Sequence, residues 1–114
     1  MIQEAMRVYL QGARVIREEA ENGLTRQQHN LAVLYGLGLG VPLDHQKAFE
    51  WYKKAADEGL PESQFNLAIA YQNGMGTNKD LVNAFKYYIL ASAQGLMIQT
   101  APNELPRPLA SEYR

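Results

Sequence analysis

Histidine, cysteine and paired carboxylates are the side chains that most often carry chemistry, and this sequence has few of them. It contains two histidines, at positions 29 and 45, and no cysteine. A metal site or a nucleophilic triad needs several such groups at matching spacing, and neither histidine has a carboxylate at a ligand's spacing. The acidic runs 18–21 and 57–58 are typical of a solvated helix face. We therefore expect surface histidines, no catalytic residue, no metal and no cofactor.

Glycines at positions 36, 38 and 40 have the composition of a loop that cradles phosphate. In a phosphate loop, however, the glycines follow a β-strand and open a helix. Here they follow a stretch with helical spacing, and two of them recur 36 residues later as Gly74 and Gly76. The sequence therefore predicts a turn that belongs to a repeated unit.

The unit that positions these residues is written twice in the chain. Residues 24–59, shifted by 36 positions, align with residues 60–95, and 14 of the 36 pairs are identical. Unrelated residues at ordinary frequencies would match at only about two or three positions. A repeat of this length indicates a helical solenoid, whose units bury a core by stacking and then present an extended surface.

Each repeat carries the signals for two helices. Thr25 and Gln28 form a capping-box pattern that predicts the start of one helix, which the glycines then end. Asp44 is predicted to cap the next helix and Gly59 to end it. Residues that share their type between the two repeats are expected to pack between helices: Ala32/Ala68, Ala48/Ala84, Ala55/Ala91, Tyr35/Tyr71 and Tyr52/Tyr88.

The shared pattern N-L-A-x-x-Y-x-x-G-x-G-x-x-x-D-x-x-x-A-F-x-x-Y-x-x-A-x-x-x-G begins at Asn30 and again at Asn66. It resembles the Sel-like repeat, a relative of the tetratricopeptide repeat with a longer loop between its helices. The resemblance covers residues 24–95. It implies an all-α, right-handed solenoid of antiparallel helix pairs that serves as an adaptor, and it implies no single reaction.

We expect a single domain over residues 1–114. It divides into an N-terminal capping helix (1–23), repeat one (24–59), repeat two (60–95) and a C-terminal tail (96–114). The N-terminal helix has an apolar stripe at helical spacing, made of Ile2, Ala5, Met6, Tyr9, Ala13, Ile16 and Ala20. This stripe is predicted to pack on both helices of repeat one. The missing partner helix leaves two alternatives, a truncated repeat array or a contact between two molecules through the stripe.

The second helix of repeat two differs from its counterpart in repeat one. Lys53 and Lys54 are replaced by Ile89 and Leu90, so this helix is apolar on nearly every side and must be covered. One candidate cover is the tail, through Leu96, Met97, Ile98, Leu105 and Leu109, with prolines that favour an extended course. The alternative is a partner or a second molecule, and Ile89 and Leu90 then form a second interaction surface.

A binding face follows from the tetratricopeptide geometry that the resemblance implies, in which the first helix of each pair lines the concave wall. The residues predicted to face this groove are Arg26, His29, Val33, Leu37, Glu62, Phe65, Ile69, Gln72 and Asn73. The floor is apolar and the rim polar, as in an anchor site for a peptide or protein. The alternative is that Phe65 and Ile69 pack beneath the N-terminal helix or the tail.

Charge and composition limit the partners. With 11 basic and 12 acidic residues, the net charge of −1 gives no field that would gather nucleic acid or an anionic membrane. The N-terminus has no signal-peptide pattern, and no stretch has the length and apolarity of a spanning helix. We expect a cytoplasmic protein if the chain is full-length.

The sequence therefore predicts a protein–protein interaction module that is not an enzyme. An inhibitor or immunity-type protein that occludes one target is the alternative within the binding class. A cell-wall or lactam-binding hydrolase is the alternative from another class. It is disfavoured because the Sel-like proteins linked to that chemistry are cysteine-rich secreted arrays, whereas this chain has no cysteine.

Overall fold

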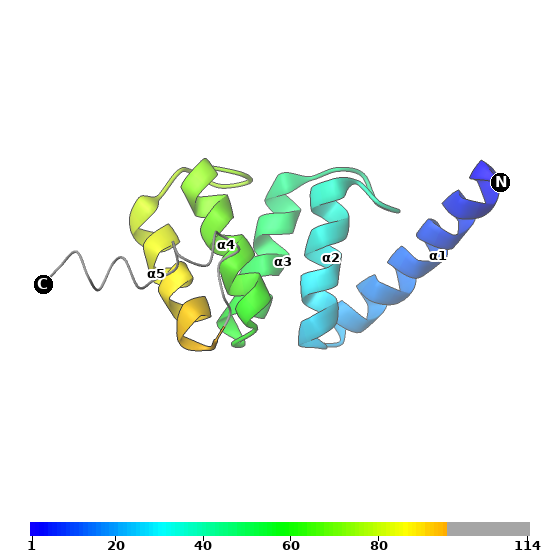
Figure 1. Cartoon of the computed structure of the whole chain (residues 1–114). Helices are drawn as coiled ribbons and strands as arrows, with labels where there is room; N and C mark the ends of the chain where they lie inside the picture. The colour runs from blue at the N-terminus through cyan, green and yellow to red at the C-terminus, as the bar shows by residue number, and fades with distance from the viewer. Residues whose placement is uncertain (96–114) are drawn as a thin grey trace, which may run out of the picture.

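The computed structural model describes residues 1–95 and places them in five α-helices (Figure 1). They are α1 (Ile2–Glu21), α2 (Thr25–Leu37), α3 (His45–Asp57), α4 (Pro61–Asn73) and α5 (Leu81–Ala93). Each helix packs against the next along the chain, and the molecule is elongated, with extents of 57 × 27 × 24 Å. Within residues 1–95 there is no strand. The predicted all-α solenoid of helix pairs is confirmed.

Aspartate caps begin the second helix of each repeat, as predicted. The Asp44 carboxylate accepts a hydrogen bond from the backbone N–H of Lys47 at 3.0 Å. The Asp80 carboxylate accepts the equivalent bond from Asn83 at 3.1 Å. These bonds satisfy backbone donors that have no partner inside the helix, and they fix where α3 and α5 begin.

Glycine ends α3 in the predicted way. Gly59 has φ 101°, and the backbone N–H of Leu60 donates to the carbonyl of Ala55 at 3.1 Å. This left-handed turn is a Schellman motif, which reverses the chain so that α4 can pack back on α3. In repeat one, α2 continues past Gly36 and ends at Leu37, where Gly38 adopts φ 70°.

The predicted capping box at the start of α2 is wrong. The residue at the cap position is Leu24, and no side chain bonds the first backbone N–H groups of the helix. The hydroxyl of Thr25 instead donates to the carboxylate of Glu58, and the amide of Gln28 is buried and donates to the carbonyl of Ala20 at 3.5 Å. Both side chains are therefore used to join neighbouring helices.

The core consists of small and aromatic side chains between successive helices. Leu31 and Leu67, at the same position of the two repeats, are fully buried. The predicted packing residues around them are buried or half-buried: Ala32, Tyr35, Ala48, Tyr52, Ala55, Ala68, Tyr71, Ala84, Tyr88 and Ala91. Alanines allow two helix backbones to approach, and the tyrosines fill the remaining space.

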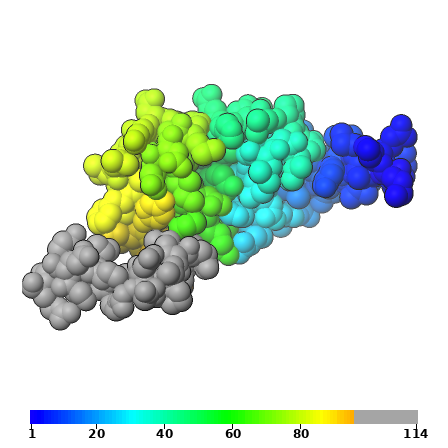
Figure 2. Space-filling view, turned by 45° about the horizontal axis from the view of Figure 1, so that its top comes forward, coloured from blue at the N-terminus to red at the C-terminus, as the bar shows by residue number. Residues whose placement is uncertain are grey.

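The N-terminal helix packs along only part of its length. Ala13 and Ala20 are buried, whereas Ile2, Met6 and Tyr9 are exposed by 80%, 53% and 50%. The expectation that the whole stripe packs on repeat one is therefore wrong within the described residues. The reason is geometric, because α1 has 20 residues and α2 has 13, and α1 projects obliquely past the end of the array (Figures 1 and 2).

A buried glutamine links each repeat to the helix before it. Gln28 on α2 donates to the carbonyl of Ala20 on α1, and Gln64 on α4 donates to the carbonyl of Ala56 on α3 at 3.2 Å. The end of α1 thus takes the place that α3 has in the following unit. We call α1, α3 and α5 the B-type helices and α2 and α4 the A-type helices.

The two glutamines differ in their second bond. The side-chain carbonyl of Gln64 accepts a bond from the amide of Gln94 at 2.7 Å, whereas that of Gln28 is buried and has no partner among the described residues. The residue equivalent to Gln94 is Glu58, and an ionised carboxylate has no hydrogen to donate. A buried acceptor is therefore unsatisfied in repeat one.

We expect Glu58→Gln to raise the free energy of unfolding by about 1 kcal/mol, because its amide can donate to Gln28 while its carbonyl still accepts from Thr25. Urea denaturation followed by circular dichroism measures the change. The matched control is Gln94→Glu, which removes the donor in repeat two and should lower stability by a similar amount. A Glu58→Gln protein no more stable than the wild type would contradict this account.

Candidate functional site

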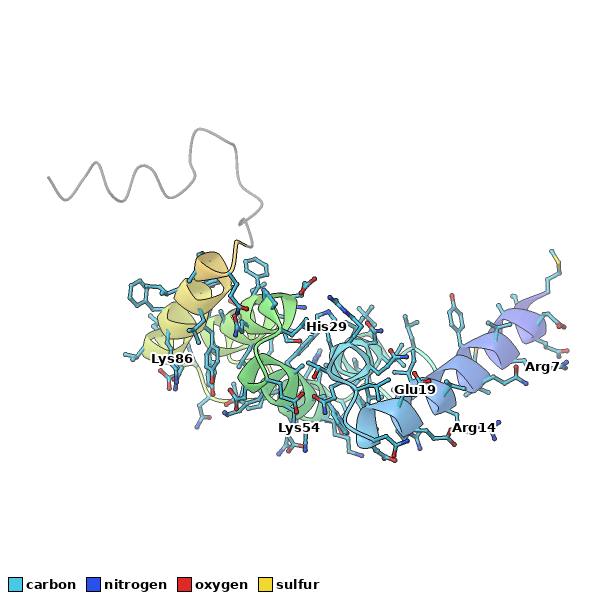
Figure 3. All side chains as sticks on the ribbon, turned by 90° about the horizontal axis from the view of Figure 1, so that it is seen from below. Arg7, Arg14, Glu19, His29, Lys54 and Lys86 are labelled. Carbon is cyan, nitrogen blue, oxygen red and sulfur yellow. The ribbon has the colours of Figure 1, made fainter. Side chains whose placement is uncertain are left out.

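The two A-type helices, α2 and α4, meet through their N-terminal halves. The guanidinium of Arg26 lies 3.2 Å from the carboxylate of Glu62, and Nδ1 of His29 lies 2.7 Å from the hydroxyl of Ser63. Figure 3 shows His29 in the region where α2 faces α4. Both pairs join α2 to α4. They hold the two helices together at the N-terminal end of the surface that these helices form, which we call its closed end.

Towards their C-terminal ends, α2 and α4 border a pocket of about 370 Å³. Its walls come from both A-type helices and its floor from α3, and the lining residues are Val33, Gly36, Leu37, His45, Ala48, Phe49, Tyr52, Asn66, Ile69, Ala70 and Met75. Most of these side chains are apolar. The pocket therefore suits an apolar side chain of a partner, with few polar groups to orient it.

The nine residues predicted to face one groove are distributed over three settings. Val33, Leu37 and Ile69 line the pocket. Arg26 and Glu62 form the ion pair described above, at the closed end. The other four are His29, Phe65, Gln72 and Asn73.

These four lie outside the pocket lining. Phe65 packs edge-on against Tyr88 with ring centroids 5.6 Å apart, and Gln72 accepts a hydrogen bond from the Tyr88 hydroxyl at 2.6 Å. Asn73 is the last residue of α4 and is exposed. His29 packs edge-on against Tyr52 at 5.5 Å, so Phe65 and His29 hold equivalent places in the two repeats. Phe65 therefore contributes to packing within its own repeat.

Tyr52 and Asn66 bring polar groups into the pocket lining. Burial raises the pKa of the Tyr52 hydroxyl, and a hydrogen bond with Asn66 acts in the opposite direction. The hydroxyl therefore stays protonated near neutral pH and keeps a hydrogen to donate. Together with the Asn66 amide it offers the pocket a donor and an acceptor.

Sequence analysis missed the floor of the pocket. Phe49 and Tyr52 of α3 are identical to their counterparts in repeat two, and sequence assigns Tyr52 to packing between helices. His45 and Met75 differ from their counterparts, Leu81 and Leu39, but they lie on a B-type helix and a loop. A search restricted to A-type helices could not find them. The signal that could have done so is the three-residue spacing that places Phe49 and Tyr52 on one face of α3.

His29 is half-buried, and the prediction of a surface histidine is wrong for it. Burial lowers the pKa of His29, the nearby Arg26 guanidinium lowers it further, and the Glu62 carboxylate acts in the opposite direction. The neutral imidazole is therefore the form that the folded protein favours. His45 is exposed at the rim of the pocket, as predicted.

We expect stability to fall as the pH drops below 6.5, the ordinary pKa of histidine. In this window the unfolded chain binds a proton at His29 that the folded chain resists, so protonation favours unfolding. Urea denaturation at a series of pH values should show a smaller fall for His29→Gln, whose amide can still bond Ser63 but does not titrate. Equal slopes for the two proteins would show that His29 does not contribute.

Glu62 affects stability at a lower pH. Its own backbone N–H and the Arg26 guanidinium lower the pKa of its carboxyl. Its contribution to stability is therefore present above the ordinary pKa of 4.5 and is lost as the pH falls further. As the pH falls, the His29 effect therefore begins before the Glu62 effect.

Groups of three or more metal-ligating side chains do not occur within residues 1–95. Over the same range, no helix has both the length and the apolar character needed to cross a bilayer.

Stacked antiparallel helix pairs, with a hollow between their first helices, define a helical-repeat scaffold. Comparison with known families identifies which one, because the sequence model of the Sel1 repeat matches residues 28–60 and 61–96. The chain belongs to the Sel1 repeat family. Proteins of this family are generally protein–protein interaction scaffolds, and they are typically non-catalytic.

Solved structures agree with this assignment. A Sel1 repeat protein from Oxalobacter formigenes is 39% identical, with a TM-score of 0.72 over 82% of this chain and 77% of that one. The protective antigen c5321 of uropathogenic Escherichia coli, which displays the same fold, is 34% identical with a TM-score of 0.76 over 77% of this chain. This chain spans only 19% of the length of c5321.

Helicobacter pylori cysteine-rich protein B shares the fold, with a TM-score of 0.70 at 23% identity over 74% of this chain and 63% of that one. Our chain has no cysteine. No curated protein was found that matches the chain in sequence.

Proposed function

We propose that this protein binds a protein or peptide partner through the surface formed by α2 and α4, and that an apolar side chain of the partner enters the pocket between them. The observation that carries the proposal is the pocket itself. It is bordered by two successive repeats, it is lined mainly by apolar side chains, and Leu37 at its edge is 64% exposed. Apolar anchors in such pockets supply much of the binding energy in protein complexes.

At the closed end of the surface, polar groups lie beside the apolar pocket. Arg26 and Glu62 are exposed by 57% and 43% at their side chains and form an ion pair with spare hydrogen-bonding capacity. A polar rim beside an apolar centre is the usual anatomy of a protein interface. The partner class that fits is an extended or helical segment with one large aliphatic or aromatic residue.

The test uses random peptides displayed on phage and selected on the wild-type protein. We expect the selected peptides to share a large apolar residue and to bind Leu37→Asp more than about tenfold more weakly, equivalent to a loss of about 1.4 kcal/mol. Fluorescence anisotropy of labelled peptides measures the affinities. Leu37 is exposed, so its replacement leaves the core intact.

The matched control is Leu43→Asp. Leu43 is 60% exposed in the loop between α2 and α3, and it does not line the pocket. The Leu43→Asp substitution introduces the same charge at a similarly exposed position, and it should leave peptide affinity unchanged. Selected peptides that bind all three proteins equally would exclude the pocket as the anchor site.

A further inference from the structure

The last helix of the described region has an apolar stripe that no described residue covers. Leu81, Val82, Phe85 and Ile89 are exposed by 60%, 80%, 63% and 50%. Their spacing of three and four residues places them on one side of α5, opposite the buried Ala84, Tyr87 and Ala91. We call these four residues the α5 stripe. It spans residues 81–89 of the helix.

Comparison with α3 shows that the α5 stripe includes a place where a neighbour packs. Phe49 on α3, equivalent to Phe85, packs edge-on against Tyr71 of α4 with ring centroids 5.2 Å apart. On α3, this side of the helix is the one on which the next helix of the chain packs. Phe85 lies on the equivalent side of α5. The α5 stripe continues an interface that the protein already uses.

The α5 stripe is also wider than the face that α4 covers on α3. Its other three residues replace polar side chains of α3: Leu81 replaces His45, Val82 replaces Gln46 and Ile89 replaces Lys53. A segment that packs on the α5 stripe therefore covers positions whose counterparts on α3 carry polar side chains. Such a contiguous apolar surface is typical of an interaction site.

The backbone delivers the following residues to this side of the helix. After α3, Gly59 with φ 101° turns the chain at Leu60, and the next segment covers the helix just completed. After α5, Gly95 has φ 91° and is followed by Leu96 at the position equivalent to Leu60. The turn at Gly95 therefore matches the one that, after α3, directs the following segment onto the helix just completed.

The residues after Gly95 have the composition of a cover and lack the sequence pattern of another A-type helix. Residues 96–114 lie outside the described residues, and their sequence includes Leu96, Met97, Ile98, Leu105 and Leu109. The residues equivalent to Leu67, Ala68 and Tyr71 are Asn103, Glu104 and Arg107, so the packing pattern of the repeat is lost. Prolines at 102, 106 and 108 disfavour a regular helix of the length of α4.

We propose that residues 96–109 lie in extended form along the α5 stripe of the same molecule and cover its apolar side chains. A helix of 13 residues, such as α5, is about 20 Å long, a distance that about seven extended residues span. The 14 residues from 96 to 109 can therefore turn at Gly95 and run back along α5. A short tether gives an effective concentration on the order of millimolar, which favours this occupant over a second molecule.

The experiment exploits the absence of cysteine. Ala110→Cys, just beyond Leu109, gives the full chain a single thiol for a nitroxide spin label. We expect the label to broaden the ¹⁵N-resolved amide signals of the α5 stripe, relative to the reduced label, and to leave those of Ile2 and Met6 at the far end of the array sharp. Ile98→Asp should remove the broadening by removing an apolar contact.

A mixed sample identifies the molecule that is covered. Spin-labelled chain without ¹⁵N is added to ¹⁵N-labelled chain without a spin label, and we expect no broadening there, because the contact is within one molecule. Broadening of the α5 signals in the mixed sample would replace the proposal with a contact between molecules. Sharp α5 signals in both samples would overturn it.

A second pair of variants controls for folding. Phe85→Asp should reduce the broadening across α5, whereas Leu43→Asp, at 60% exposure in a distant loop, should not. Both side chains are exposed, so neither change opens the core. Undiminished broadening in Phe85→Asp would also overturn the proposal.

Discussion

Leu67→Ala is expected to lower the free energy of unfolding by about 2–5 kcal/mol. Leu67 is fully buried, and α4 packs against both α3 and α5, so this side chain lies in the cluster that joins the two repeats. Removing it forfeits apolar burial and leaves a cavity that rigid neighbouring helices fill only in part. Urea denaturation followed by circular dichroism measures the loss.

Two leucines provide the comparison for Leu67. Leu31 is the equivalent, fully buried residue of repeat one, and Leu31→Ala should also cost several kcal/mol, within about 2–5. Leu43 is 60% exposed, and Leu43→Ala should change stability by less than about 0.5 kcal/mol. A Leu67→Ala protein as stable as Leu43→Ala would show that the repeats are not joined through this core.

Gly76→Ala is expected to destabilise the protein by about 3 kcal/mol. Gly76 has φ 74°, a conformation that costs an L-residue about 1–2 kcal/mol. In addition, a Cβ there would lie 2.1 Å from the carbonyl oxygen of His45, and relieving such overpacking costs about 1–3 kcal/mol more. The atom in the way belongs to the backbone, so no side-chain rotation can relieve the contact.

Gly59→Ala separates the two contributions. Gly59 has φ 101°, but a Cβ there would meet nothing within 4 Å, so only the conformational cost applies. Thermal unfolding should therefore show a markedly larger loss for Gly76→Ala. Gly12 lies inside α1 in open space, and Gly12→Ala should stabilise the protein by about 0.5–1 kcal/mol. Equal losses for Gly76→Ala and Gly59→Ala would contradict the close approach.

The close approach at Gly76 also bears on the pocket. His45 supplies the carbonyl group of this contact, and Met75 directly precedes Gly76. Both residues line the pocket. The same arrangement recurs one unit earlier, where a Cβ on Gly40 would lie 2.6 Å from the carbonyl oxygen of Tyr9. The loop after each A-type helix thus packs closely on the preceding B-type helix. This contact helps to fix the shape of the surface proposed to bind a partner.

Sequence alone determined the repeat, the order of its helices and most of its core. These features depend on local signals that occur twice, such as the aspartates that cap α3 and α5 and the glycine after α3. Spacing along a helix also places Leu31 and Leu67 on the buried side without knowledge of the partner helix. Of the residues predicted from sequence to share one groove, Val33, Leu37 and Ile69 line the pocket.

Only the tertiary structure decided which polar side chains act between helices and where the pocket lies. Thr25 and Gln28 match a local capping pattern, but α1 and α3 offer them partners that the local sequence does not contain. His29 loses its surface setting because Tyr52 and Ser63 approach it from other helices. The pocket exists because α2 and α4 meet at one end and leave space at the other, and the relative placement of two helices depends on every side chain packed between them.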